Sequence, residues 1–255
     1  MLQSPGRIEF VFTPTGVKGV DKLLSEKGVP QGYIIYLLGA PGSGKTTFAM
    51  QFLHHGAKFE NEPGVYVSLD EHPAYLRAHA REFGWDLEGL EAAGKLALLD
   101  GSPIRSLPGE TKLGSITIGK RDFSLVSLIK WITEAVKRIG AKRLVIDPTA
   151  VFSVQYTTES ERRFAVMELL QAISQTGCTT LLVSELSHTS LDRTYQFEEY
   201  LAQGVIIMRK IIRSGGVTRV FQIDKMRIID HDTQPHPYRI TQTGIEVFPT
   251  ELAIP

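Results

Sequence analysis

Residues 39 to 46 read Gly39-Ala40-Pro41-Gly42-Ser43-Gly44-Lys45-Thr46, which matches the pattern GxxxxGK[ST] of a P-loop. This loop follows the apolar run Tyr33-Ile34-Ile35-Tyr36-Leu37-Leu38, which predicts a buried strand, and precedes a segment compatible with a helix. Glycines let the backbone N–H groups of such a loop turn toward phosphate oxygens, and the N-terminus of the following helix faces the same anion. The sequence therefore predicts that residues 39–46 bind phosphate groups.

The side chains at the end of the loop add a cation and a metal ligand. Lys45 would reach the β- and γ-phosphates of a nucleotide, and Thr46 would offer its hydroxyl to Mg²⁺. The candidate nucleotide contacts are Gly39, Ala40, Pro41, Gly42, Ser43, Gly44, Lys45, Thr46 and Thr47. The motif alone leaves kinases, GTPases and motors open, as well as a glycine-rich turn that binds nothing. No guanine-reading NKxD-like string follows the P-loop, so the motif itself does not identify the base.

Length and composition predict one α/β domain. The chain has 255 residues, of which 42% are hydrophobic, enough for one full core. A formal net charge of +0 gives no global electrostatic case for nucleic-acid binding, although a local basic stripe stays possible. No apolar run is long enough for a membrane span and residues 1–6 lack the features of a signal peptide, so we expect a cytoplasmic protein without membrane contact. The single cysteine and single asparagine, Cys178 and Asn61, are typical of thermophilic proteins.

The middle of the chain alternates strands and helices, as a parallel sheet requires. We expect strands near residues 33–38, 64–69, 96–100, 142–147 and 179–184, with helices near 45–60, 73–83, 124–139 and 160–176. Closely spaced strands follow at 204–209, 218–225, 238–241 and 245–248, where Ser214-Gly215-Gly216 supplies a turn. This end should extend the sheet in antiparallel fashion. The polar insertion at 101–122 is expected to be a mobile loop.

Asp147 is the candidate metal-binding carboxylate. It ends the apolar strand Leu144-Val145-Ile146, and the carboxyl ends of parallel strands meet at the edge where a P-loop holds its nucleotide. A carboxylate delivered there by a buried strand matches the Walker B arrangement, which supports Mg²⁺ beside the phosphates. The alternative is an aspartate that only begins a turn before Pro148.

The acidic pair Asp70-Glu71 is the candidate catalytic base. It closes the strand Val65-Tyr66-Val67-Ser68-Leu69 and precedes a helix that begins at Pro73. A carboxylate at this place can orient and polarise the water that attacks the γ-phosphate. We favour Glu71 over Asp70 as the base, while their division of labour stays open. The alternative is that Asp70 caps the helix and Glu71 lies in its first turn.

Taken together, these motifs resemble the KaiC-like branch of the RecA/RadA superfamily of P-loop ATPases. The segments 15–24 and 28–32 look like the entry TGxxGxDxLL and GxPxG of that family, and Phe83-Gly84-Trp85-Asp86 resembles its FGWD segment. The resemblance implies a RecA-like, mostly parallel sheet flanked by helices with an antiparallel C-terminal extension. It also implies one domain, with residues 1–32 as an entry segment and 33–255 as the ATPase core. Ser184, beside Glu185, takes the place of a polar sensor of the γ-phosphate.

The segment Lys225-Met226-Arg227, followed by His231, is similar to the KMRGTxH motif of the family. The resemblance implies that Lys225 and Arg227 reach the nucleotide of the next subunit in a ring, usually a hexamer, with Met226 and His231 beside them. An arginine at the transferring phosphoryl group stabilises charge that grows in the transition state. On charge pattern alone, the pair could equally be a solvated Lys and Arg on a strand face. Ile228-Ile229 departs from the usual Gly-Thr of the family.

Single-domain members of the family include RadA paralogues, so binding of single-stranded DNA or a recombinase is the second hypothesis. The loops 154–163 and 186–199 would carry it with a basic and aromatic mixture: Tyr156, Arg162, Arg163, Arg193, Tyr195 and Phe197. The same loops hold acids that would repel DNA: Glu159, Glu161, Asp192, Glu198 and Glu199. In this alternative, a regulator of recombination and repair binds DNA and its ATP turnover is incidental.

The preferred prediction is therefore an ATPase that needs ATP and Mg²⁺ and acts at the interfaces of a homo-oligomer. Its hydrolysis would be coupled to conformational change or assembly, in a regulatory role.

Overall fold

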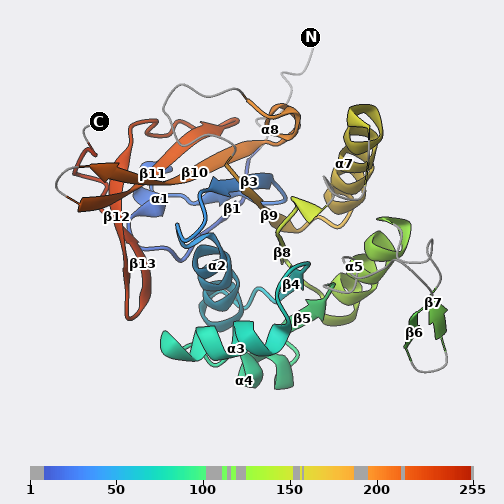
Figure 1. The fold of residues 1–255 in the computed structure, drawn as a ribbon. Helices are drawn as coiled ribbons and strands as arrows, with labels where there is room; N and C mark the ends of the chain where they lie inside the picture. Colours follow the sequence, from blue (N-terminus) through green and yellow to red (C-terminus); the bar gives the residue numbers. More distant parts are fainter. Residues whose placement is uncertain are drawn as a thin grey trace, which may run out of the picture.

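A nine-stranded sheet organises the residues that the computed structural model describes, which are 9–101, 111–113, 116–118, 125–151, 156, 158–186, 195–213 and 216–253. Its strand order is β13-β12-β11-β10-β3-β9-β8-β4-β5 (Figure 1). The parallel part contains β3 (Ile34–Gly39), β4 (Gly64–Ser68), β5 (Leu96–Asp100), β8 (Arg143–Asp147) and β9 (Thr179–Glu185). Every residue of β3, β4 and β8 is buried, as expected for strands with helices on both faces. The predicted parallel strands are confirmed.

The C-terminal strands extend this sheet as predicted. They are β10 (Gly204–Arg213), β11 (Gly216–Met226), β12 (His236–Thr241) and β13 (Gly244–Val247). The first part of β10 pairs in parallel with β3, and the whole of β10 pairs antiparallel with β11. Strand β10 is thus longer than the predicted 204–209 and joins the parallel to the antiparallel part.

Four long helices lie where the hydrophobic periodicity places them: α2 (Lys45–Phe59), α3 (Pro73–Glu82), α5 (Leu125–Ile139) and α7 (Glu159–Ser174). The short helices α1 (Val20–Leu23), α4 (Leu87–Ala92) and α8 (Phe197–Leu201) were not predicted, because four to six residues are too few to establish a helical period. Within the described part of the chain, no helix combines the length and apolar content needed to cross a bilayer.

Two apolar cores lie on the two faces of the sheet. One packs α2 and the C-terminal strands against one face, with Phe48, Phe52 and Phe221 among its buried residues. The other packs α5 and α7 against the opposite face, through residues such as Leu128, Ile132 and Leu169. Figure 1 shows α2, α3 and α4 on one side of the parallel strands and α5 and α7 on the other. The RecA-like layering of helix, sheet and helix follows from these two cores.

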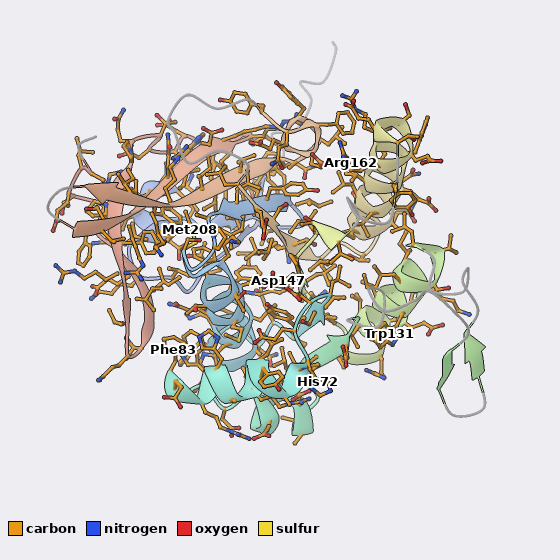
Figure 2. All side chains as sticks on the ribbon, in the orientation of Figure 1. His72, Phe83, Trp131, Asp147, Arg162 and Met208 are labelled. Atoms are coloured by element: carbon orange, nitrogen blue, oxygen red, sulfur yellow. The ribbon has the colours of Figure 1, made fainter. Side chains whose placement is uncertain are left out.

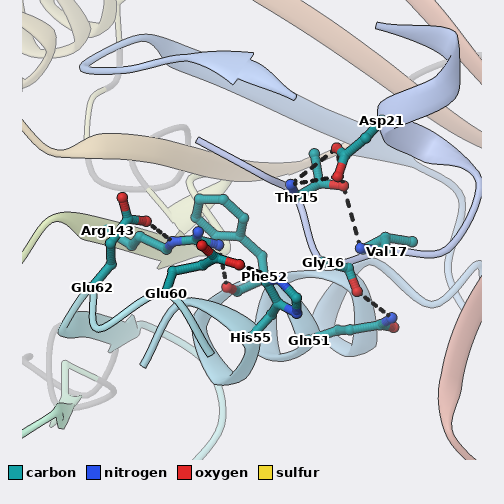
Figure 3. A network of polar contacts seen from close by, with 10 residues as sticks. All are labelled: Thr15, Gly16, Val17, Asp21, Gln51, Phe52, His55, Glu60, Glu62 and Arg143. Atoms are coloured by element: carbon teal, nitrogen blue, oxygen red, sulfur yellow. Dashed lines mark hydrogen bonds and ion pairs between the residues drawn. The ribbon is translucent and has the colours of Figure 1, made fainter. Parts of the chain in front are cut away.

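The entry segment joins the core through buried apolar residues and polar contacts rather than through long strands. Its β1 (Phe12–Thr13) and β2 (Val29–Pro30) form a separate two-stranded sheet. The Thr15 hydroxyl donates to Asp21 at 2.6 Å, and Gln51 of α2 donates to the Gly16 carbonyl at 3.0 Å (Figure 3). The first bond lies within the entry segment, and the second attaches this segment to the helix that follows the P-loop.

The insertion at 101–122 falls mostly outside the described residues. Two short strands within it, β6 (Thr111–Leu113) and β7 (Ile116–Ile118), pair antiparallel with each other. A hairpin therefore lies in the segment where only a loop was expected.

His54 should make folding stability depend on pH. Its ring is buried on α2 and stacks on Trp85 with 5.5 Å between ring centroids. Burial, and then the charges of Lys58 and His55, lower the pKa of His54 from 6.5 to about 4. The folded protein therefore keeps His54 neutral while the unfolded chain takes up a proton below pH 6.5. Stability is complete above pH 6.5 and falls as the pH drops toward 4, by up to about 3 kcal/mol.

Denaturant unfolding at several pH values checks this expectation. His54→Phe, which keeps an aromatic ring at the stack, should remove most of the loss between pH 6.5 and 4. His79→Phe is the matched control, because His79 also packs against an aromatic ring, that of Phe83. An unchanged pH slope in His54→Phe would contradict the assignment.

Candidate active site

The P-loop joins the end of β3 to the start of α2. Gly42 and Gly44 take φ angles of 69° and 94°, in the left-handed region that favours glycine. Gly44 is the N-cap of α2, and no side chain caps the helix there. The first backbone N–H groups of α2 therefore have no side-chain acceptor, which leaves them to an anion. Ser43 is fully buried, so its contribution to the loop is structural or through its backbone.

The Lys45 side chain lies against the P-loop. Its Nζ donates to the carbonyls of Gly39 and Ala40 at 2.8 and 3.1 Å. Burial lowers the pKa of Lys45, and the negative charges of Asp147 and Glu185 oppose that shift. The ammonium is thus partly desolvated and surrounded by carbonyl and carboxylate oxygens, a setting in which a phosphate gains more from it than in water.

Thr46 and Asp147 meet as the sequence predicts. The Thr46 hydroxyl donates to Asp147 Oδ2 at 2.8 Å, and Tyr66 donates to the same oxygen at 2.6 Å. Figure 2 labels Asp147 in the middle of the molecule, close to α2. Burial raises the pKa of Asp147, while the bonds from Tyr66 and Thr46 and the charge of Lys45 lower it. These partners help to keep the buried carboxyl ionised, as metal binding requires.

Tyr66 is a site residue that sequence reasoning missed. It lies inside the buried strand β4, and its pKa is raised, mainly by burial and then by the neighbouring Asp147. A tyrosine in a fully buried strand needs a partner for its hydroxyl, and that requirement was the available signal.

Asp70 and Glu71 line the same cavity as Lys45, Thr46 and Asp147. The cavity holds about 160 Å³, and its remaining wall residues are Tyr66, Ser68, Leu76, Pro148 and Glu185. Both acids are exposed, and the Ser68 hydroxyl bonds the backbone N–H and carbonyl of Glu71. The alternative that Asp70 caps the next helix is wrong: His72 is the N-cap of α3 and accepts a bond from the Ala74 N–H at 3.2 Å.

Ser184 and Glu185 at the end of β9 share one cavity, and Glu185 also lines a second one. Ser184 lines a larger neighbouring cavity of about 510 Å³, while Glu185 lines both that cavity and the one with Lys45. A sensor role for Ser184 stays a prediction, and the structure brings its neighbour Glu185 closer to the phosphate cradle.

Lys225 and Arg227 lie at the opposite end of the sheet from the P-loop. Met226, between them, pairs with Gly204, which pairs with Ile35 at the start of β3. Gly39, at the P-loop end of β3, is four residues further on, or roughly 13 Å along the strand. The two cations bond carbonyls at the C-terminal end of α8: Lys225 Nζ reaches those of Glu199 and Ala202 at 2.9 and 2.7 Å, and Arg227 reaches that of Tyr200 at 3.2 Å.

Burial limits what three other predicted nucleotide-binding residues can contribute. Met226 packs in the core beside Gly204, and Thr47 is buried in α2, so both could offer only backbone groups to a nucleotide. His231 is half-buried, and its Nε2 has no hydrogen-bond partner within the described chain.

The residues present fit a nucleotide with Mg²⁺. Loop glycines in left-handed conformation, an uncapped helix N-terminus and Lys45 together make an anion site. The hydroxyl of Thr46 and the carboxylate of Asp147 are hard oxygen donors that lie within 2.8 Å of each other, as a shared Mg²⁺ ligand set requires.

Comparison with known proteins assigns the family. The family model described as "ATPase: KaiC" matches residues 13–252. The chain belongs to the KaiC-like ATPase family. This match spans both the P-loop and the segment with Lys225 and Arg227, so the KaiC-like family assignment covers all of the site residues placed above.

Three relatives illustrate the extent of the similarity. The UPF0273 protein PH0284 of Pyrococcus horikoshii is 32% identical over 238 residues, 93% of this chain and 94% of that protein. The circadian clock oscillator protein KaiC of Thermosynechococcus vestitus is 35% identical over 92% of this chain, but over only 44% of the clock protein. The crystal structure of the KaiC-like protein PH0186 from Pyrococcus horikoshii OT3 is similar with a TM-score of 0.80 and 34% identity, covering 94% of this chain and 100% of that one.

These comparisons confirm the RecA-like fold of the KaiC-like chain. Because the chain spans less than half of the clock protein, the activity of that whole protein is not carried over.

Ile228 marks where this chain departs from the KaiC-like motif. Its φ is 74° and its side chain is 62% exposed. The backbone thus keeps a conformation that the usual glycine adopts freely, and an isoleucine there costs about 1–2 kcal/mol.

Three of the six residues expected to bind DNA lie on helices. Arg162 and Arg163 are on α7 and Phe197 is on α8, while 152–155, 157 and 187–194, including Asp192 and Arg193, fall outside the described residues. Arg163 pairs with Glu159, and its guanidinium lies 4.6 Å from the Phe197 ring centroid. The KaiC-like family match does not favour the alternative of a DNA-binding regulator.

Proposed function

We propose that this KaiC-like chain binds ATP with Mg²⁺ and hydrolyses it at contacts between identical subunits. One observation carries the proposal. Lys45, Thr46, Asp147 and the acidic pair line one cavity at the carboxyl ends of the parallel strands, while Lys225 and Arg227 lie at the opposite ends. A site divided in this way is complete only when two chains meet.

The residues on the P-loop side bind the phosphates and Mg²⁺ and orient the groups that hold them. Backbone N–H groups of the loop and the start of α2 hold the phosphate chain, and Lys45 exchanges its bonds to the Gly39 and Ala40 carbonyls for phosphate oxygens. Thr46 and Asp147 would hold Mg²⁺, which supplies neutralisation of charge on the phosphates. Tyr66 and Thr46 fix the orientation of the Asp147 carboxylate.

Glu71 orients the attacking water. The Ser68 hydroxyl bonds both backbone polar groups of Glu71, which holds this residue at the mouth of the cavity. Its exposed carboxylate can accept a proton from water as the nucleophile approaches phosphorus. Asp70 lines the same cavity beside Glu71.

Lys225 and Arg227 complete the site of a neighbour. In the single chain they bond the carbonyls at the end of α8, which is a favourable place for cations. To act on a neighbour they exchange these carbonyls for phosphate oxygens. We propose a closed homo-oligomeric ring, with six subunits as the family resemblance implies, because each subunit gives and receives such a contact.

Substitution of Glu71 tests the hydrolysis step. Glu71→Gln keeps the size of the side chain and removes its basicity, so the ATPase rate should fall by about 10²–10⁴ while ATP affinity changes little. Single-turnover hydrolysis and equilibrium ATP binding measure the two effects separately. Asp70→Asn, assayed in parallel, shows how much each of the two acids contributes to the hydrolysis rate.

Glu82→Gln is the control, since Glu82 is exposed at the far end of α3. A Glu71→Gln enzyme with the unaltered hydrolysis rate would remove Glu71 from the mechanism. Failure of the unaltered protein to hydrolyse ATP in any assembly state would overturn the proposed function.

A further inference from the structure

Lys210 lies beside the P-loop and has no role in the site described so far. It is on β10, two residues beyond Met208, whose partner in β3 is Gly39. Strand β10 therefore continues past the end of β3 and runs alongside the loop. The Lys210 Nζ is 3.5 Å from the position that a Cβ on Gly42 would occupy.

The direction of the Lys210 side chain follows from strand alternation. Ile206 and Met208 belong to the core that contains α2, and Lys210 continues the same face of β10. Met208, labelled in Figure 2, is fully buried, whereas Lys210 is half-buried and Gly42 is exposed. The ammonium thus reaches the outer side of the loop at the point where solvent begins.

A second cation lies next to Lys210. Arg219 of β11 is paired with Lys210 in the strand register, and its charge acts on Tyr238, whose hydroxyl bonds the Ser43 carbonyl. Within the described part of the chain, neither Lys210 nor Arg219 forms an ion pair with a carboxylate. Two neighbouring cations without acids favour an anion beside them.

We propose that Lys210 is a second phosphate-binding lysine of this site, which contacts the phosphate chain of ATP or ADP from the Gly42 side of the loop. Lys45 approaches the same chain from the side of Gly39 and Ala40. This inference rests on the proposed function, because it adds a residue to the same nucleotide site. A lysine suits the position since its flexible stem carries a compact charge with three donors.

Isothermal titration of MgATP and MgADP into the full chain tests the proposal. Lys210→Met should weaken both nucleotides by about tenfold or more, as expected for loss of a charge-assisted hydrogen bond. Lys210→Arg should bind nearly as tightly as the unaltered protein. Lys142→Met is the matched control, because Lys142 is exposed at the opposite end of the sheet, directly before β8. The loss in Lys210→Met should also shrink at high salt.

Thermal unfolding of the nucleotide-free variants separates binding from support of the loop. The proposal requires an unchanged melting temperature in Lys210→Met together with weaker binding. Lower melting temperature without rescue by Lys210→Arg would assign Lys210 a structural role and overturn the inference. Affinity of Lys210→Met within twofold of the unaltered protein would overturn it too, while the proposed function stands. If the unaltered protein binds neither nucleotide, both fail together.

Discussion

Replacement of Lys45 by alanine is expected to weaken ATP binding by roughly a hundredfold or more, because it removes the half-buried cation that faces the phosphate charge. Hydrolysis should fall by about 10³, since the same ammonium would stabilise charge in the transition state. Fluorescence titration with a labelled ATP analogue and a phosphate-release assay measure the two losses. The cavity keeps Thr46 and Asp147 in this variant, so residual binding should still depend on Mg²⁺.

Lys58→Ala is the control for Lys45→Ala, because Lys58 lies in the last turn of the same helix. This variant should bind and hydrolyse ATP like the unaltered protein. Full ATP affinity in Lys45→Ala would contradict the assignment of the loop as the nucleotide site.

Mixing two inactive variants should restore activity. Arg227→Ala alone is expected to lower hydrolysis by about 10³–10⁵, as for loss of an arginine finger. Lys45→Ala subunits keep an intact Arg227, and Arg227→Ala subunits keep an intact P-loop. In an equal and random mixture about a quarter of the contacts join an intact loop to an intact finger, so about a quarter of the unaltered rate should return.

The matched control is a mixture of Lys45→Ala with Glu71→Gln. Both residues belong to the same side of the divided site, so no contact between these subunits is complete and no activity should return. A Lys45→Ala and Arg227→Ala mixture that stays inactive, although both variants assemble, would show that Arg227 does not act on a neighbour. Mass measurement with and without ATP verifies the assembly state.

The parallel sheet and its phosphate edge could be predicted from sequence because they depend on local signals. The run Tyr33 to Leu38, the glycines after it and the helical period from Lys45 determine strand, loop and helix within a few residues of each other. Asp147 could be placed beside Thr46 although 101 positions separate them, because carboxyl ends of parallel strands converge.

Features set by contacts between distant segments could not be predicted in this way. Tyr66 carries no motif, and its role appears only when β4 and β8 lie side by side. Helix α8 is one turn long, and its bonds to Lys225 and Arg227 bridge more than twenty positions. His72 became the cap of α3 where Asp70 was the stronger candidate by propensity, because its ring nitrogen reaches the Ala74 N–H.

Because Lys225 and Arg227 are separated from the P-loop of their own chain, the rate of ATP hydrolysis should depend on the concentration of the protein. The pairing of Met226 with Gly204, and of Gly204 with Ile35, keeps these cations away from the phosphate cradle of their own chain. Under the proposed function, a monomer would bind ATP and hydrolyse it slowly. Turnover would then follow how often chains meet, so that dilution preserves the nucleotide and accumulation of the protein consumes it.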